Sequence, residues 1–392
     1  MRQHWLQLLI LVSSFNLASL CLAAPFVPQA GNEVLELLRD RPLDSKAREL
    51  RALRAALTRD INNLAIASRI ARRYIEESRA QGDPRYLGYA QAALGPWWSQ
   101  AQPPNTVLLL RATIRQSNHD FDAALEDLSR LLKSAPDNAQ AWLTRATILQ
   151  VRGEYEDASR SCEPLARLAP SYEVTCKAGV ASLTGQALRS YELLQGVLDN
   201  IGADSFAEKN WIETGLAEIA ARLGRNEAAE VHFKRAIQRG AADPYLKGAY
   251  ADFLLDAGRP AEVTRLLSTD VRIDGLVLRL ALAEQALGAR ELPQRIATLQ
   301  ARFDAARARG DQVHRREEAR FYTALLNQPR EGLRLAQANW AVQKEPADAR
   351  ILLEAALAAN ERKAAQTVID WMTRNKLEDA ALSRLVRRVQ QS

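Results

Sequence analysis

Histidine, cysteine and aromatic residues are scarce in this chain of 392 residues, which has four histidines, three cysteines and 6% aromatic residues. His119, His232 and His314 are isolated in the sequence from one another and from any cysteine. The chain therefore offers no zinc-ligand spacing and no nucleophile beside a base. The glycine-rich spacing that binds phosphate is also missing. These absences predict a non-enzymatic protein with no catalytic residues, metal ligands or cofactor.

The alternation of apolar and polar residues that marks a β-strand is missing as well. Long stretches are instead rich in Ala, Leu, Arg, Glu and Gln, which favour helix over strand. The composition therefore predicts an all-α protein. Beyond the amino-terminal segment, no part of the chain is long and apolar enough to cross a bilayer, so we expect no stable membrane insertion once that segment is removed.

One part of the chain repeats itself at a fixed interval. The segment Arg-Ala-Thr-Ile-Arg-Gln at 111–116 returns as Arg-Ala-Thr-Ile-Leu-Gln at 145–150, which defines a 34-residue interval. The same interval separates three further pairs: Phe121 and Tyr155, Ala124 and Ala158, and Pro136 and Pro170. A fixed period of this length, with apolar residues at helical spacing and a proline closing each unit, indicates stacked helix pairs.

The order of residues within one unit resembles the tetratricopeptide repeat. Trp142 lies early in the expected first helix, Ala146 lies where that helix approaches its partner, and Gly153 lies in the turn between them. Small residues are needed at the approach because a bulky side chain would separate the helices. The same frame continues later in the chain at Ala217, Gly224, Ala229, Phe233, Ala236 and Gly258.

This resemblance implies a right-handed α-solenoid of antiparallel helix pairs, forming one array in which each repeat packs on its neighbours. The predicted segments are a signal peptide at 1–23, irregular helical repeats at 24–104, two regular units at 105–172, a degenerate repeat at 173–207, two regular units at 208–270, and degenerate repeats at 271–392. The last segment ends in a predicted capping helix with an apolar stripe of Leu382, Leu385, Val386 and Val389.

The segment 1–23 has the pattern of a secretory signal. Arg2 precedes a largely apolar stretch, and small residues at Cys21 and Ala23 suit cleavage after Ala23. We therefore expect an exported, periplasmic protein. The alternative is a lipoprotein anchored through Cys21, but Leu20 is a poor residue before a lipidated cysteine.

Removal of Cys21 would leave two cysteines, Cys162 and Cys176. They lie on either side of Pro170, in the second helix of one expected repeat and the first helix of the next. Antiparallel packing brings these helices together, and an oxidising compartment favours a disulfide. The alternative is that both are small buried residues.

Charge does not point to nucleic acid. The formal net charge is +6 and falls by one unit to +5 when Arg2 is removed. Positive and negative residues alternate, which predicts a solvated helix face with salt bridges. The pattern occurs at Arg307, Arg309, Asp311, Arg315, Arg316, Glu317, Glu318 and Arg320. A nucleic-acid strip would need interleaved aromatic residues, so no nucleic-acid partner is predicted.

The resemblance also implies a binding surface, because in that family the first helix of each repeat lines a concave groove. The matching positions with predicted partner contacts are Thr113, Gln116, Thr147, Gln150, Trp211, Glu218, Tyr245, Asp252 and Asp256. The later positions are aromatic and acidic, which favours a partner segment with basic and apolar residues. The lysine and asparagine set with which some members clamp a terminal carboxylate is absent. For Trp211 and Tyr245, packing between repeats is an equal alternative.

These features predict an exported scaffold or adaptor that binds a protein or peptide partner. One alternative is a periplasmic holdase or assembly factor for an envelope complex, which would bind many unfolded chains. Another is a hydrolase whose site is formed by residues distant in sequence.

The signal peptide gives a first testable prediction. Mass spectrometry of the mature protein should find an amino terminus at Ala24 or Pro25, with no lipid on Cys21. A diacylated terminus at Cys21 would contradict it and would establish a membrane anchor.

Overall fold

The computed structural model describes residues 45–202, 205–240, 243–311 and 313–391, and the predicted signal peptide lies outside them. Within these ranges the regular structure is helical and no strand occurs, as the composition predicts. Residues 49–392 form one compact unit. The helices of its first half are α1 (Ser45–Arg59), α2 (Leu64–Gln81), α3 (Arg85–Ala93), α4 (Gly95–Trp98), α5 (Asn105–Ser117), α6 (Phe121–Ser134), α7 (Ala139–Val151), α8 (Tyr155–Cys162), α9 (Leu165–Leu168), α10 (Pro170–Ala181) and α11 (Ala187–Asn200).

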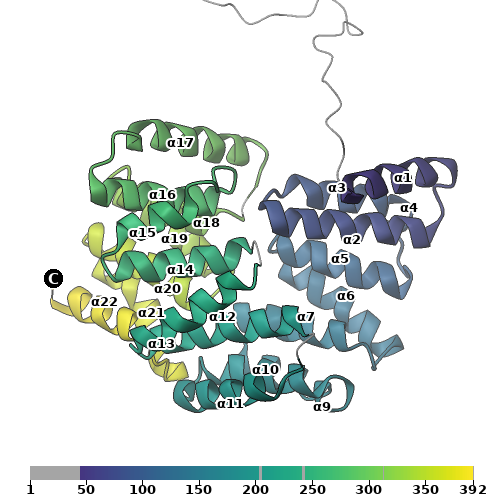
Figure 1. The fold of residues 1–392 in the computed structure, drawn as a ribbon, viewed down its shortest axis with the longest axis horizontal. Helices are drawn as coiled ribbons and strands as arrows, with labels where there is room; N and C mark the ends of the chain where they lie inside the picture. Colours follow the sequence, from purple (N-terminus) through teal and green to yellow (C-terminus); the bar gives the residue numbers. More distant parts are fainter. Residues whose placement is uncertain (1–44, 203–204, 241–242, 312, 392) are drawn as a thin grey trace, which may run out of the picture. The chain divides into compact units, whose positions relative to one another are not determined.

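The second half continues the same alternation of helices and short turns (Figure 1). Its helices are α12 (Phe206–Arg222), α13 (Asn226–Gln238), α14 (Pro244–Asp256), α15 (Pro260–Leu267), α16 (Asp274–Leu287), α17 (Leu292–Ala308), α18 (Arg315–Ala324), α19 (Pro329–Trp340), α20 (Pro346–Ala358), α21 (Arg362–Asn375) and α22 (Ala380–Gln391).

Consecutive helices pack in pairs, such as α5 with α6, α7 with α8 and α12 with α13. The small residues of the repeat lie at these contacts: Ala112 and Ala124 are fully buried, and Ala146 and Ala158 repeat this arrangement one unit later. This burial confirms the packing role predicted for them. The solenoid of helix pairs is therefore built as the sequence pattern predicts.

The turns within the pairs follow the same interval. Gly153 has a φ of +78°, a left-handed conformation that glycine adopts without a steric cost. One repeat earlier the equivalent position is His119, which also has a positive φ, of 59°. In the C-terminal repeats Asn327 and Asn360 take this conformation instead. Asparagine tolerates it better than most residues, which explains why these repeats lack the glycine signal.

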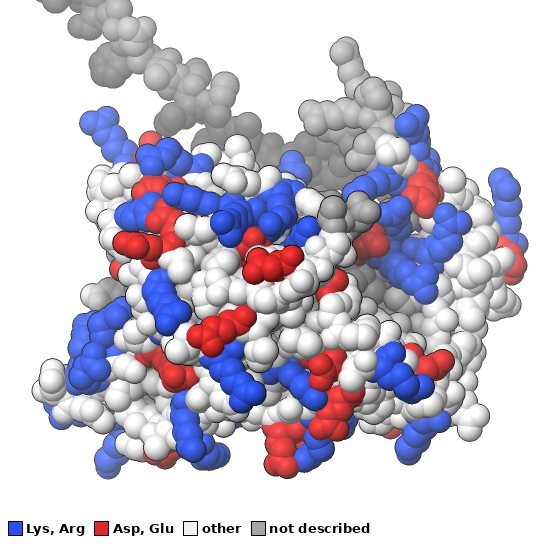
Figure 2. All heavy atoms as spheres, turned by 60° about the horizontal axis from the view of Figure 1, so that its bottom comes forward, with Lys and Arg blue, Asp and Glu red and all other residues white. Residues whose placement is uncertain are grey.

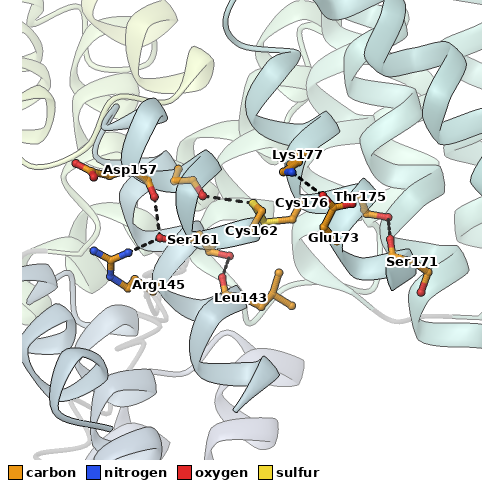
Figure 3. The surroundings of a disulfide bond; sticks show 12 residues. Leu143, Arg145, Asp157, Ser161, Cys162, Ser171, Glu173, Thr175, Cys176 and Lys177 are labelled. Atoms are coloured by element: carbon orange, nitrogen blue, oxygen red, sulfur yellow. Dashed lines mark hydrogen bonds and ion pairs between the residues drawn. A yellow bond between two sulfur atoms is a disulfide. The ribbon is translucent and has the colours of Figure 1, made fainter. Parts of the chain in front are cut away.

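Cys162 and Cys176 form a disulfide between α8 and α10, with their Cα atoms 5.8 Å apart (Figure 3). The bridge joins the second helix of one repeat to the first helix of the next, as predicted. Both sulfur atoms lie in the apolar core between these helices, and the Cys162 Sγ also lies 3.3 Å from the Ala158 carbonyl oxygen. The bridge therefore fixes the junction between two repeats.

The chain then folds back on itself. Buried residues of α7, α8 and α10 share one apolar core with buried residues of α16 to α22. At this contact the Lys344 amide, just before α20, donates a hydrogen bond of 2.7 Å to the Val151 carbonyl oxygen at the end of α7. The side chain of Glu378, just before α22, accepts from the Ala187 amide of α11 at 2.7 Å. The C-terminal helices therefore pack against the middle repeats.

The last helix covers the end of the core with its apolar stripe. Leu382 and Val389 are buried and Leu385 and Val386 are partly buried, so the predicted stripe faces the protein. The stripe packs mainly against α20 and α21. Figure 1 shows α21 and α22 in yellow beside α13 in teal, and a Cβ at Gly224 would lie 3.8 Å from Ala380.

The helices are unsuited to a bilayer. Among the residues that the structure describes, no helix combines the length and apolar character that a membrane span needs.

The disulfide gives a second prediction. The Cys162→Ala, Cys176→Ala double variant should lose about 3 kcal/mol of unfolding free energy, because a short crosslink restricts the unfolded chain. Chemical denaturation measures this loss. Reduction of the wild-type protein should give a loss of similar size, and equal stability of the oxidised and reduced forms would contradict the prediction.

Candidate functional site

A cavity of about 580 Å³ lies among the first helices of successive pairs. Most of its lining residues belong to α7, α10, α12, α14, α16, α18, α20 and α22 and to the segment before α20, and a few belong to α11 and α13. Seven of the predicted contact residues line it: Thr147, Gln150, Trp211, Glu218, Tyr245, Asp252 and Asp256. Thr113 and Gln116, on α5, are not among its lining residues. A separate groove between α10 and α11 contains none of the predicted residues.

The repeat interval explains why these side chains converge. The same 34-residue interval separates Trp211 on α12 from Tyr245 on α14, and Glu218 from Asp252. Equivalent positions on successive repeats point to the same side of a solenoid. The cavity thus has an aromatic row and an acidic row. Whether a partner contacts them stays a prediction.

The aromatic row is accessible to solvent. Trp211 is 40% exposed and stacks on Tyr172 with ring centroids 5.9 Å apart. Tyr245 is 56% exposed, and its hydroxyl donates a hydrogen bond of 2.6 Å to the Glu218 carboxylate. Residues that only pack between repeats would be buried. Their exposure favours the recognition role over the packing alternative.

Two of the acidic residues, Asp252 and Asp256, are already paired with arginines of the chain. Asp252 accepts from Arg279 at 2.6 Å and from Arg320 at 2.5 Å. Both oxygens of Asp256 accept from the Arg350 guanidinium, at 2.6 and 2.7 Å. Burial alone would raise the pKa of Asp252, but these arginines outweigh burial and hold the pKa well below its usual value. The pairs leave less free negative charge in the cavity than the prediction of a basic partner assumes.

The predicted solvated face at the start of α18 is wrong. Arg316 and Glu317 line the cavity, and Glu318 is buried with 4% exposure. Arg320 points to Asp252. Helix α18 packs between α16 and α20. Its arginines therefore reach carboxylates of other repeats: Arg316 contacts Glu345, and Arg320 contacts Asp252.

The sequence interpretation also missed a row of arginines. Arg316 on α18, Arg350 on α20 and Arg384 on α22 all line the cavity, and they follow one another at the 34-residue interval. We call these three residues the arginine ladder. The interval itself was a readable signal, but it fell in repeats that carry asparagine, at Asn327 and Asn360, where earlier repeats have the turn glycine.

Charges on the outer surface are mixed. Over the face seen in Figure 2, Lys and Arg side chains lie interspersed with Asp and Glu side chains. Such a surface gives a weaker long-range field than one of a single sign.

Glu345, just before α20, has a strongly perturbed carboxyl group at the cavity. Burial and the neighbouring Asp348 raise its pKa to about 7, against the opposing effect of Arg316. Arg316 contacts Glu345 at 3.1 Å and Asp348 at 3.5 Å. Asn339 and Gln343 both donate to Asp348 and hold it in place. The charge on this edge of the cavity therefore changes near neutral pH.

The histidines have structural surroundings. His119 occupies a turn, and burial lowers its pKa. His232 is buried between the Glu213 carboxylate, at 2.5 Å, and the Tyr191 hydroxyl, at 3.0 Å. Among the described residues, no group of three or more His, Cys, Asp and Glu could hold a metal ion.

Comparisons with known proteins place part of this chain in a family. Residues 116–173 match the model of the tetratricopeptide repeat. The segment includes most of the two units that carry the 34-residue interval, and it ends just after Pro170. This segment thus consists of tetratricopeptide repeats, as its sequence indicates. No curated protein matches it over its sequence.

Solved structures with a similar fold share little sequence with it. A tetratricopeptide-repeat protein from Parabacteroides merdae is 14% identical, with 61% of this chain and 92% of that chain covered and a TM-score of 0.44. Yeast Tom70 is 11% identical, with 88% and 77% covered and a TM-score of 0.41. Human IFIT1, solved as a dimer with m7Gppp-AAAA, is 12% identical, with 88% and 86% covered and a TM-score of 0.43.

Glu345 gives a third prediction. Its pKa in the folded protein, about 7, lies above the ordinary value of 4.5, so the folded state binds this proton more tightly than the unfolded state. The stability that the proton contributes is complete below pH 4.5 and is lost as the pH rises through 7. The variant Glu345→Gln keeps the hydrogen-bond acceptor but cannot ionise. Its stability relative to the wild type should be greater at pH 8 than at pH 5 by about 2 kcal/mol.

Urea denaturation at the two pH values measures this difference. The matched control is Glu361→Gln, which removes an exposed carboxylate before α21 and should show no such pH dependence. Equal pH profiles for the wild type and Glu345→Gln would contradict the assignment.

Proposed function

We propose that this tetratricopeptide-repeat protein is an exported, non-catalytic scaffold that binds a short segment of a partner protein in the cavity. The observation that carries the proposal is the pair of exposed aromatic side chains, Trp211 and Tyr245, at equivalent positions of successive repeats. Exposed aromatic rings in a concave site are typical energetic anchors of protein recognition.

The size of the cavity supports a short segment. Its volume of about 580 Å³ lies within the range of about 300 to 1,000 Å³ typical of ligand pockets. A whole folded domain would need a much larger complementary surface. The cavity also combines apolar lining with hydrogen-bonding groups, which an extended peptide backbone and its side chains can both use.

The proposed location rests on the amino-terminal sequence. An apolar stretch after Arg2 and small residues before Ala24 are typical of export. The disulfide supports this proposal, because such bonds persist in oxidising compartments.

Peptide selection tests the binding function and gives a fourth prediction. The purified protein should select short peptides from a random display library, and Trp211→Ala should weaken their binding about 30-fold, as expected for the loss of about 2 kcal/mol at an anchor. Calorimetry or fluorescence anisotropy measures the affinity.

The matched control is Tyr89→Ala. Tyr89 on α3 is 53% exposed, close to the exposure of Tyr245, but it does not line the cavity. Circular dichroism melting must show that Trp211→Ala remains folded. Selected peptides that bind wild type and Trp211→Ala equally well would move the site elsewhere, and the absence of any selected peptide would overturn the proposed function.

A further inference from the structure

The members of the arginine ladder differ in how completely they are paired. Arg316 contacts Glu317 and Glu345, at 3.3 and 3.1 Å. Arg350 is held by Asp256 and by Glu354. Arg384, the last member, is exposed and has no ion pair within the described part of the chain. The ladder therefore ends in an unpaired guanidinium at the cavity.

Two further cations line the cavity without an ion pair among the described residues. The Lys344 ammonium donates to the Arg152 carbonyl oxygen, at 3.5 Å, and Lys344 lines the cavity. Arg222 donates to the Ser182 hydroxyl at 2.8 Å, while its buried Nε atom has no hydrogen-bond partner. Burial and the nearby Arg152 lower the pKa of Lys344, and they outweigh the opposing effect of Glu154.

The carboxylates of the cavity that have no ion pair among the described residues carry less charge than these three cations. Glu218 and Asp379 line the cavity without an ion pair within the described ranges. Glu218 accepts a hydrogen bond from Tyr245, and Asp379 accepts one from the Leu382 amide. Burial raises the pKa of both groups, even though Arg222 opposes the shift. Both carboxylates are therefore less negative than exposed ones at the same pH.

We infer that the cavity binds an acidic peptide segment, whose side-chain carboxylates pair with Arg384, Lys344 and Arg222 while its apolar side chains contact Trp211 and Tyr245. This inference rests on the proposed function and specifies its partner. A basic segment would meet Asp252 and Asp256, which already have arginine partners, and Glu218 and Asp379, whose pKa values burial raises. It would also place its own charge near three cations that have no ion pair among the described residues. Charge complementarity at the cavity therefore selects against a basic segment and for an acidic one.

The unpaired donors also predict how the segment is recognised. They come from three separate elements: the end of α12, the segment before α20, and α22. Internal Asp or Glu side chains can reach them. Peptides blocked at both ends should therefore bind as well as peptides with a free carboxyl terminus.

Matched peptide pools test the inference and give a fifth prediction. Three pools of short peptides, acetylated and amidated at their ends, share randomised apolar and aromatic positions and carry Glu, Gln or Lys at the same fixed positions. The Glu pool should bind about tenfold more tightly than the Gln pool, and the Lys pool more weakly than both. The preference for Glu should shrink at high salt, because ions screen exposed charge pairs.

Variants connect the preference to the named side chains. Arg384→Gln should weaken binding of the Glu pool about threefold to fivefold, the range for an exposed ion pair, and leave the Gln pool unchanged. Combining it with Lys344→Gln should remove most of the preference for Glu. The matched control is Arg387→Gln, which removes an exposed arginine of the same helix that does not line the cavity.

The outcomes separate this inference from the proposed function. Equal binding of the Glu and Gln pools, or tighter binding of the Lys pool, would overturn the acidic partner but keep a peptide-binding scaffold. A preference for Glu that survives in the double variant would also overturn it. No binding of any pool would overturn both. Circular dichroism melting checks that Arg384→Gln and the double variant are folded.

Discussion

The cavity depends on the packing of the C-terminal helices against the middle repeats. Gly153 makes this contact possible in two ways. Its φ of +78° suits the turn after α7, and a Cβ there would lie 3.3 Å from the Lys344 side chain and 3.5 Å from Trp371. The absent side chain therefore leaves room for the segment before α20. A residue that the repeat pattern requires for a turn also permits the approach of a segment much later in the chain.

Apolar packing, more than ion pairing, holds this arrangement. Trp340 and Trp371 are buried, meet edge to face with centroids 5.2 Å apart, and share a core with Tyr155. The bridge from Arg350 to Asp256 is partly exposed, and such pairs contribute about 1 kcal/mol or less. The main effect of the ion pairs is therefore on the charge of the cavity and not on stability. They decide which charges in the cavity remain available to a partner.

The sequence predicts those features of the structure that depend only on contacts within one repeat or between adjacent repeats. The 34-residue interval located the turn at Gly153, and the antiparallel helix pairs indicated that Cys162 and Cys176 would meet. The return of the chain was not predictable in this way, because Tyr155 meets the Lys344 carbonyl across 189 residues of sequence. The arginine ladder was predictable only in part. Its interval was visible, but its exposure to a cavity follows only from the return of the chain.

Partner binding is consequently linked to the packing of the C-terminal helices against the middle repeats. The aromatic anchors belong to α12 and α14, whereas Arg384 belongs to α22 and Lys344 to the segment before α20. A segment that contacts both groups binds only when the C-terminal helices are packed in place. Its binding free energy therefore stabilises the closed arrangement over any arrangement in which they are released. By the same linkage, the buried core around Trp371 contributes to affinity without touching the partner, because it keeps the two groups of side chains at a fixed separation.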